Sequence, residues 1–217
     1  MQSKSHNKLY ALMAWMGVVP LMSSATIALL AISYEAQIYN FSVWAWGLFY
    51  IATTITMALA ITPTTFISLF SGFFLGFEGI LPLVISYQLA SLMGYNLAKK
   101  FDDSFLDLIL TKYPTSRQMF DNVKQNQFIL VLLSRLSPAL PFAIMNVVLS
   151  ISRIRISNFF WGGLIGMLPR TLFFIWVGQK ASELNEALEG TQNFYISAVL
   201  SIFIVYIIYR IVKKQLK

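Results

Sequence analysis

Long apolar runs without a charged residue constrain the fold of this chain more than any other feature. They occupy residues 9–32, 43–77, 79–98 and 193–209. About 20 apolar residues in a helix cross the hydrocarbon core of a bilayer. The runs lack the alternation over about 10 residues that is typical of transmembrane β-strands. The chain is only 12% charged, against about 25% for soluble domains. The sequence therefore predicts an all-α polytopic membrane protein.

About five segments are predicted to span the membrane. They are residues 9–32, 43–62, 79–99, 157–178 and 193–210. The first is too long for a typical signal peptide and has no clear cleavage site, so we expect it to remain as a helix with a kink at Pro20.

Two further apolar segments, 61–77 and 128–150, are interrupted. They share helix-interrupting residues, which are Pro63, Gly72 and Gly76 in the first and Pro138 and Pro141 in the second. Each is followed by a glycine-rich span, so the chain repeats the same order of elements. Paired interruptions of this kind mark the binding site of many transporters, and irregular backbone at membrane depth needs protein or water around it. We predict two re-entrant hairpins; the alternative is two ordinary kinked helices.

The distribution of lysine and arginine predicts the orientation. If both hairpins are re-entrant, eleven cations in 99–127, 151–156 and 210–217 fall on one side, against Lys4, Lys8 and Lys180 on the other. The positive-inside rule then places the C-terminus in the cytoplasm and the N-terminus outside. The hairpins enter from opposite sides, as an inverted repeat. The net charge of +7 is interpreted as topology and anionic-lipid contact, not nucleic-acid binding.

Three regions follow from this pattern: 1–59 with N-terminal transmembrane helices, 60–180 with the two hairpins, and 181–217 with a C-terminal helix and basic tail. The connector 101–126 between the halves is either an amphipathic helix on the cytoplasmic interface or a solvated link.

The residues needed for most catalytic chemistries are absent. The only histidine is His6, there is no cysteine, and every aspartate lies in the connector. Neither a zinc motif nor a phosphate-cradling glycine loop is present. We therefore expect a non-enzymatic protein without a metal or other cofactor.

Ionisable groups within apolar segments are functional candidates, because an unpaired charge there costs about 2.5–3.5 kcal/mol. Arg135 is predicted near the tip of the second hairpin, where it binds a phosphate bidentately or caps carbonyls freed by the prolines. Arg170 either binds substrate or extends its charge to the interface. Glu78 is a solvated turn residue or a proton or counter-ion site. Asn146 bonds the facing hairpin or a substrate.

The stretch "SRLSPALPFAIMNVVLSISRIRISNFFWGGLIGMLPRTLFFIWVG" (134–178) resembles the core of the DedA superfamily, also called SNARE-associated or VTT-domain membrane proteins. It is most similar to the Tvp-type bacterial branch. The matching positions are Arg135, Pro138, Pro141, Phe142, Asn146, Gly166, Pro169 and Gly178. The upstream "SLFSGFFLGFEGILPLVISYQLASLMGYNLAKKF" (68–101) resembles the first half of the family, and the resemblance covers about 60–180.

This resemblance implies two inverted hairpins that meet at the bilayer midplane. It also implies movement of phospholipids or polyprenyl-phosphate carriers between leaflets, in a bacterial cytoplasmic membrane. The chain departs from the DedA branch proper. Thr64, Thr65 and Ser68 stand where that branch has acidic residues, and Pro141 stands in place of a second arginine. These departures argue against proton coupling.

The sequence thus predicts a lipid flippase or scramblase with a polar cleft between two hairpins, whose substrate head group approaches Arg135 and Arg170. The alternatives are a proton- or ion-coupled transporter of small solutes and a non-transporting membrane-organising protein. A groove open to the side of the bundle would favour a lipid transporter, and a closed central cavity would favour a solute transporter. A tightly packed, dry core would favour the membrane-organising protein. Membrane lipids are the expected partners; coupling ions and homo-oligomerisation are left open.

Overall fold

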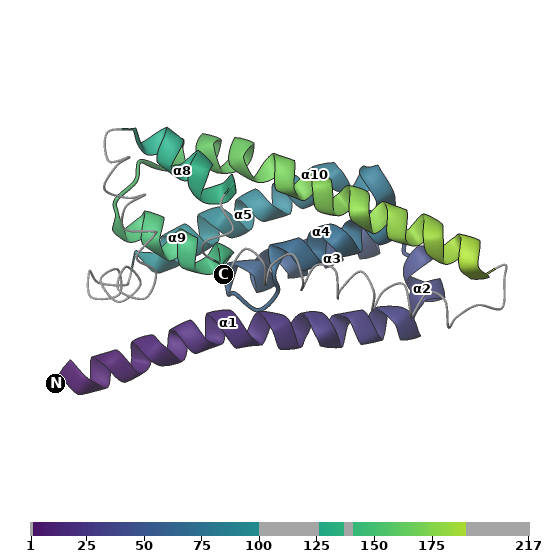
Figure 1. Ribbon diagram of the computed structural model, residues 1–217, viewed down its shortest axis with the longest axis horizontal. Coiled ribbons are helices and arrows are strands. Elements are labelled where there is room, and N and C mark those ends of the chain that lie inside the picture. The colour runs from purple at the N-terminus through teal and green to yellow at the C-terminus, as the bar shows by residue number, and fades with distance from the viewer. Residues whose placement is uncertain (1, 100–125, 137–140, 190–217) are drawn as a thin grey trace, which may run out of the picture.

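Helices form every regular element of the part of the chain that is described, residues 2–99, 126–136 and 141–189 of a computed structural model (Figure 1). The elements are α1 (Gln2–Ser33), α2 (Glu35–Tyr39), α3 (Val43–Ala58), α4 (Thr64–Leu75), the 3₁₀ turn η1 (Gly76–Gly79), α5 (Ile80–Ala98), α8 (Gln127–Leu136), α9 (Phe142–Ile151) and α10 (Ile156–Glu189). The predicted all-α membrane fold is confirmed.

Three stretches of the described residues are long and apolar enough to cross a membrane: Ala14–Ser33, Thr64–Ala98 and Ile156–Asn185. The second stretch turns at η1, so α5, with 19 residues, is its crossing helix. The predicted span 193–210, the connector 101–126 and Pro138 lie outside the described residues.

The first hairpin consists of α3 and α4. The two helices are antiparallel, since the ring of Phe49 stacks on Phe70 at 5.0 Å and Tyr50 donates a 3.2 Å hydrogen bond to Ser71. The predicted span 43–62 therefore differs from the structure. Its helix has only 16 residues and is the incoming arm of the hairpin.

The turn of this hairpin lies at residues 59–63, earlier than the predicted segment 61–77. Ala60 there adopts a φ of 59°, which a side chain disfavours. Pro63 is the N-cap of α4 and supplies no backbone donor to the preceding helix. At the other end of α4, Gly76 adopts a φ of 56° and ends the helix.

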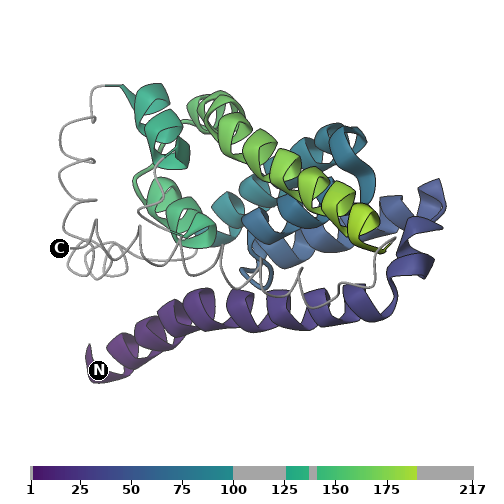
Figure 2. The same cartoon turned by 45° about the vertical axis from the view of Figure 1, so that its right-hand side comes forward.

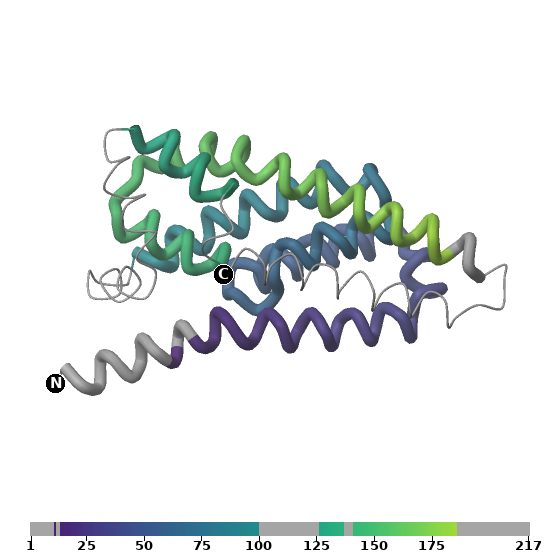
Figure 3. The backbone as a smooth tube through the Cα atoms, in the orientation of Figure 1, coloured from purple at the N-terminus to yellow at the C-terminus, as the bar shows by residue number. Residues whose placement is uncertain are grey.

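The second hairpin consists of α8 and α9, which run in opposite directions (Figure 3). The interruption predicted from the prolines is present: α8 ends at Leu136, and α9 begins at Phe142 with Pro141 as its N-cap. The returning helix α9 is fixed to α5 by the Ser150 hydroxyl, which donates a 2.7 Å hydrogen bond to the Tyr95 carbonyl.

The two halves of the chain, α3–α5 and α8–α10, repeat one arrangement in opposite directions. The long helix α10 packs against α8 with its first half and against α4 with its second half. In the same way, α5 packs against α3 and then against α9. The hairpins therefore enter the bundle from opposite ends and extend toward one another (Figure 1).

Glycines allow the backbone of α10 to lie in direct contact with the backbones of neighbouring helices. A Cβ on Gly166 would lie 2.7 Å from the Leu132 carbonyl oxygen of α8. A Cβ on Gly72 of α4 would collide with the Ile175 carbonyl oxygen of α10. Small residues of this kind are the usual contact between membrane helices.

The helix α1 flanks the bundle on one side (Figure 2), with only 6% of its apolar stretch buried. The Trp15 indole donates a 3.2 Å hydrogen bond to the Leu59 carbonyl, and the Ser23 hydroxyl donates to Ile61. Figure 1 shows that α1 begins at the end of the bundle where α10 begins. We call this the cationic end, since Lys99, Arg153 and Arg155 lie there.

This direction of α1 corrects the prediction that the N-terminus lies on the side opposite the cation-rich turns. The physical reason is the first hairpin. Because α3 turns back at residues 59–63 and does not cross the bundle, one crossing fewer separates α1 from α5. An apolar composition alone does not distinguish a hairpin arm from a span.

Candidate functional site

A cavity of about 320 Å³ lies where the two hairpins meet. The turn of the first hairpin contributes Thr62, Thr64 and Thr65 to its lining, and α10 contributes Arg170. Residues 16–21 of α1 form another wall, and residues 141–143 at the start of α9 complete it. The cavity therefore combines hydroxyl groups and a guanidinium with apolar walls.

Arg170 is the charged residue of this lining. It follows Pro169 inside the continuous helix α10, is half-buried, and its Nη2 donates a 3.1 Å hydrogen bond to Oγ1 of Thr64. The predicted site residue Arg170 thus contacts the first hairpin at the residue that begins α4.

Two helix N-termini face the same cavity. The helix α4 begins at Thr64 and α9 begins at Phe142, and both residues line the cavity. The N-terminus of a helix carries about half a positive charge and unpaired N–H donors. Together with the Arg170 guanidinium, these dipoles make the cavity attractive to an anion.

Arg135, in contrast, is not exposed to this cavity. It is 4% exposed at the end of α8, and its Nη2 donates a 2.6 Å hydrogen bond to Oδ1 of Asn146. Its guanidinium lies close to two aromatic rings, 5.1 Å from the centroid of Phe142 and 5.2 Å from that of Phe159. Arg135 and Asn146, which were predicted as separate site residues, are therefore brought together where α8 meets α9.

The charge of Arg135 has no carboxylate partner among the described residues. Within that same part of the chain, its Nε and Nη1 also have no hydrogen-bond partner. An isolated buried charge is costly, and here two aromatic faces and one amide oxygen offset part of that cost.

Gln88 of α5 is buried near Arg135, Ser91 is buried three residues further along the same helix, and the sequence reasoning missed both. A Cβ on Gly163 would lie 3.8 Å from Oε1 of Gln88 and 3.9 Å from Nε of Arg135, so these two side chains lie on the same side of α10. The Gln88 Nε2 donates to the Phe160 carbonyl at 2.9 Å. A polar amide in the middle of the predicted span 79–99 was the available signal.

Glu78 is exposed in η1, at the end of α4 opposite Thr64. Since α4 has 12 residues, it separates Glu78 from the cavity by about 18 Å. The structure does not bring Glu78 together with the arginines. The described residues contain no cluster of three His, Cys, Asp or Glu side chains for a metal ion.

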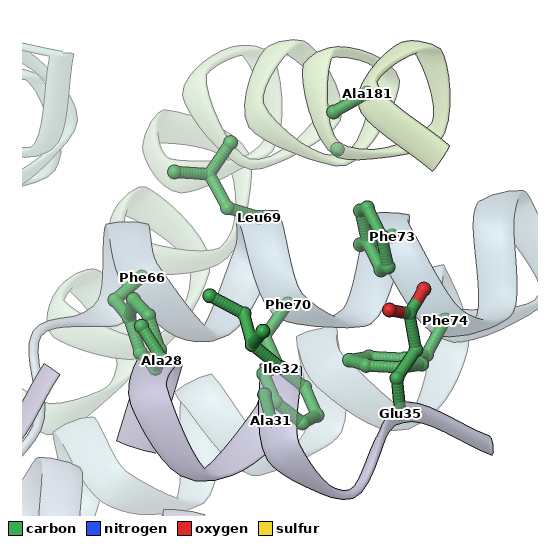
Figure 4. Close-up of a pocket in the computed structure, with 11 residues that line it drawn as sticks. Ala28, Ala31, Ile32, Glu35, Phe66, Leu69, Phe70, Phe73, Phe74 and Ala181 are labelled. Carbon is green, nitrogen blue, oxygen red and sulfur yellow. The ribbon is translucent and has the colours of Figure 1, made fainter. Parts of the chain in front are cut away.

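A second cavity of about 230 Å³ lies between α1, α4 and α10, nearer the η1 end of the bundle. Figure 4 shows that Phe66, Phe70 and Phe74 of α4 line it, with the Glu35 carboxylate at one side. The Asn185 side chain donates a 3.1 Å hydrogen bond to Glu35. This cavity is apolar and follows the polar cavity along α4.

The comparisons with known proteins agree with the earlier resemblance. The VTT domain family matches residues 62–180, which include α4, α5, α8, α9 and most of α10. A Bacillus subtilis (strain 168) protein, named "Uncharacterized protein YqeD", is 28% identical over 153 residues, which cover 66% of this chain and 72% of that protein. No solved structure gives a significant match.

Proposed function

We propose that this chain, which belongs to the VTT-domain (DedA/SNARE-associated) family, moves phosphate-bearing lipids between the two leaflets of a membrane. The family is of membrane-transporter type. The observation that carries the proposal is the polar cavity, where Arg170 and the N-termini of α4 and α9 face one space. That combination attracts a phosphate group.

The lengths of the short helices support a re-entrant arrangement. The helices α8 and α9 have 10 residues each, or about 15 Å, which is half of the 30 Å hydrocarbon core. A hairpin of this length reaches the middle of the bilayer and returns. The polar cavity at the meeting point of both hairpins would then lie near the midplane, where a head group most needs polar contacts.

The exposed position of α1 supports a lipid substrate over a small solute. One wall of the polar cavity is α1, and only 6% of the apolar stretch of that helix is buried, so it packs loosely on the bundle. Displacement of α1 would open the cavity sideways, and a lipid needs such lateral access because its head group enters the cavity while its chains stay in hydrocarbon. The polar lining favours transport over a purely membrane-organising role.

We further propose that the protein resides in a bacterial cytoplasmic membrane, with the cationic end facing the cytoplasm. Lys99, Arg153 and Arg155 lie at this end, and the positive-inside rule assigns such an end to the cytoplasm.

Reconstitution tests the function. Vesicles that contain the purified protein and a head-group-labelled phospholipid are treated with an impermeant quencher, and the rate of quenching of the inner leaflet is measured. We expect fast quenching with the native chain and at least a tenfold lower rate with Arg170→Ala. The control is Lys180→Ala, which removes an exposed cation outside the cavity and should change the rate less than twofold. A native rate equal to that of protein-free vesicles would contradict the proposal.

A further inference from the structure

Phe142 contacts both parts of the site. Its side chain lines the polar cavity that Arg170 also lines. Its ring also lies 5.1 Å from the Arg135 guanidinium and meets the ring of Tyr87 edge-on, with centroids 4.7 Å apart. The same side chain therefore borders both the cavity and the buried Arg135.

The space behind Phe142 contains an unusual concentration of unsatisfied polar atoms. Gln88, Ser91, Arg135 and Asn146 are each no more than 5% exposed. Five of their atoms have no hydrogen-bond partner among the described residues, namely Gln88 Oε1, Ser91 Oγ, Arg135 Nε, Arg135 Nη1 and Asn146 Nδ2. Folded proteins leave few buried polar groups unpaired. A group of them in one region indicates a site whose partners come from outside the described residues.

The chemistry of these atoms selects the partner. Arg135 Nε and Nη1 and Asn146 Nδ2 are all hydrogen-bond donors. Three donors, two of them on a guanidinium, suit the several acceptor oxygens of a phosphate group. The unpaired atom of Gln88 is the acceptor Oε1, and its Nε2 already donates to the Phe160 carbonyl, so only the second N–H of Nε2 is left to give a phosphate group a fourth contact.

We propose that Phe142 is a gate, and that Arg135, Asn146 and Gln88 form a second, occluded phosphate site behind it. This proposal rests on the proposed function, since the phosphate group arrives through the cavity at Arg170. With the ring in place, the aromatic face stabilises the unpaired guanidinium of Arg135. When the ring rotates away, a phosphate group takes its place and supplies charge-assisted hydrogen bonds, while Phe159 keeps its contact with the guanidinium.

The gate accounts for two arginines near one ring: Arg170 lines the cavity that Phe142 borders, and Arg135 contacts the ring itself. A phosphate group passes from Arg170 to Arg135 only when Phe142 moves, so the bundle avoids a continuous polar path through the bilayer. The turn at Pro141 places Phe142 as the first residue of α9, where no preceding helical turn restricts the rotamer of its side chain.

Cysteine accessibility tests the gate, because the chain contains no native cysteine. Ser91→Cys reports on the occluded site: Ser91 is 1% exposed and lies four residues after Tyr87, on the same face of α5. Thr65→Cys reports on the open cavity. Both are reacted with a small methanethiosulfonate reagent in reconstituted vesicles. With Phe142 present, we expect Ser91→Cys to react at least tenfold more slowly than Thr65→Cys.

Removal of the ring should open the occluded site only. Phe142→Ala should raise the Ser91→Cys rate at least tenfold and leave the Thr65→Cys rate within twofold. Phe142→Leu, which keeps a bulky side chain and guards against misfolding, should give an intermediate Ser91→Cys rate. An unchanged Ser91→Cys rate in both variants, with a normal Thr65→Cys rate, would overturn the gate.

Protection by a ligand tests the phosphate site. In the Ser91→Cys, Phe142→Ala protein, we expect dihexanoyl phosphatidic acid to slow the reaction at least threefold. The protection should disappear when Arg135→Gln is added. Inorganic phosphate is the second probe: equal protection would assign the site to the phosphate group itself, and weaker protection would assign it to a lipid head group. If neither probe slows the reaction of Ser91→Cys, the proposal of an occluded phosphate site is overturned.

The same measurements separate this inference from the proposed function. Protection of Thr65→Cys by dihexanoyl phosphatidic acid, with Phe142 intact, depends on the open cavity at Arg170 alone. If Thr65→Cys is not protected, the proposed function is contradicted. If Thr65→Cys is protected and Ser91→Cys is not, only the second site is contradicted.

Discussion

Arg135 donates a 2.6 Å hydrogen bond from Nη2 to Oδ1 of Asn146, and this bond joins the end of α8 to α9. Both side chains are buried. The bond therefore links the two helices of the second hairpin through polar side chains. Its donor is a guanidinium that has no carboxylate partner within the described residues.

Removal of the acceptor should destabilise the fold. Asn146→Leu keeps a similar volume but leaves the buried guanidinium without its hydrogen bond, which should lower the free energy of unfolding by about 2–4 kcal/mol. Thermal unfolding in detergent measures the change. The control is Asn96→Leu, because Asn96 is exposed and bonds only within α5. Equal melting temperatures for the two variants would show that the bond contributes little.

Two glycines are expected to respond in opposite ways when a methyl group is added, because one lies in the close contact between α4 and α10 and the other lies in open space. A Cβ on Gly178 would collide with the Leu69 carbonyl oxygen, whereas a Cβ on Gly47 of α3 would meet nothing within 4 Å. Gly178→Ala should therefore destabilise the protein by about 1–3 kcal/mol. Gly47→Ala should be neutral or stabilise it by up to about 1 kcal/mol. Unfolding midpoints of the two variants, measured in the same detergent, provide the comparison.

Local sequence signals predicted the helical fold and part of the site. The apolar runs require helices in lipid, and Pro141 breaks the segment that became α8 and α9. Arg135 and Asn146 stood out because polar side chains are costly inside an apolar segment. Their mutual hydrogen bond was not predicted, because the sequence suggested that Asn146 bonds the facing hairpin or a substrate, whereas it accepts from Arg135 in its own hairpin.

The remaining features depend on tertiary contacts. The helix α3 is as apolar as a span, and only its pairing with α4 shows that it is a hairpin arm. Phe142 is one of 18 phenylalanines, and nothing in its local sequence indicates that it borders both the cavity at Arg170 and the guanidinium of Arg135. Gln88 became significant only when α10 placed it beside Arg135.

Substitutions of Arg135 distinguish a binding role from a structural one. Arg135→Lys keeps the charge but loses the planar group that contacts the rings of Phe142 and Phe159. We expect transport to fall at least tenfold in Arg135→Lys while the protein remains folded, and to fall further in Arg135→Ala. If the arginine only caps the hairpin, transport per folded molecule will stay constant and lysine will restore stability. Lipid transfer in vesicles and thermal unfolding, measured on one preparation, separate these outcomes.

The position of α1 gives a topology prediction that differs from the one made by counting cations alone. The helix begins at the cationic end, where α10 also begins (Figure 1). Glu78 lies in η1, at the start of α5, whereas Lys99 of the cationic end follows the last residue of α5. An N-terminal tag and a cysteine at Ser157, which is exposed in the first turn of α10, should therefore share one side of the membrane. A cysteine at Glu78, which is also exposed, should lie on the opposite side.

With the cationic end in the cytoplasm, an impermeant thiol reagent added to intact cells should label Glu78→Cys. It should label Ser157→Cys only after the cells are permeabilised, and protease added outside should leave the N-terminal tag intact. Removal of the tag from intact cells, combined with protection of Ser157→Cys, would show that α3 crosses the membrane after all and that the first hairpin is not re-entrant. Labelling of Ser157→Cys from outside, with Glu78→Cys protected, would instead reverse the orientation of the whole bundle and leave the hairpins unchanged.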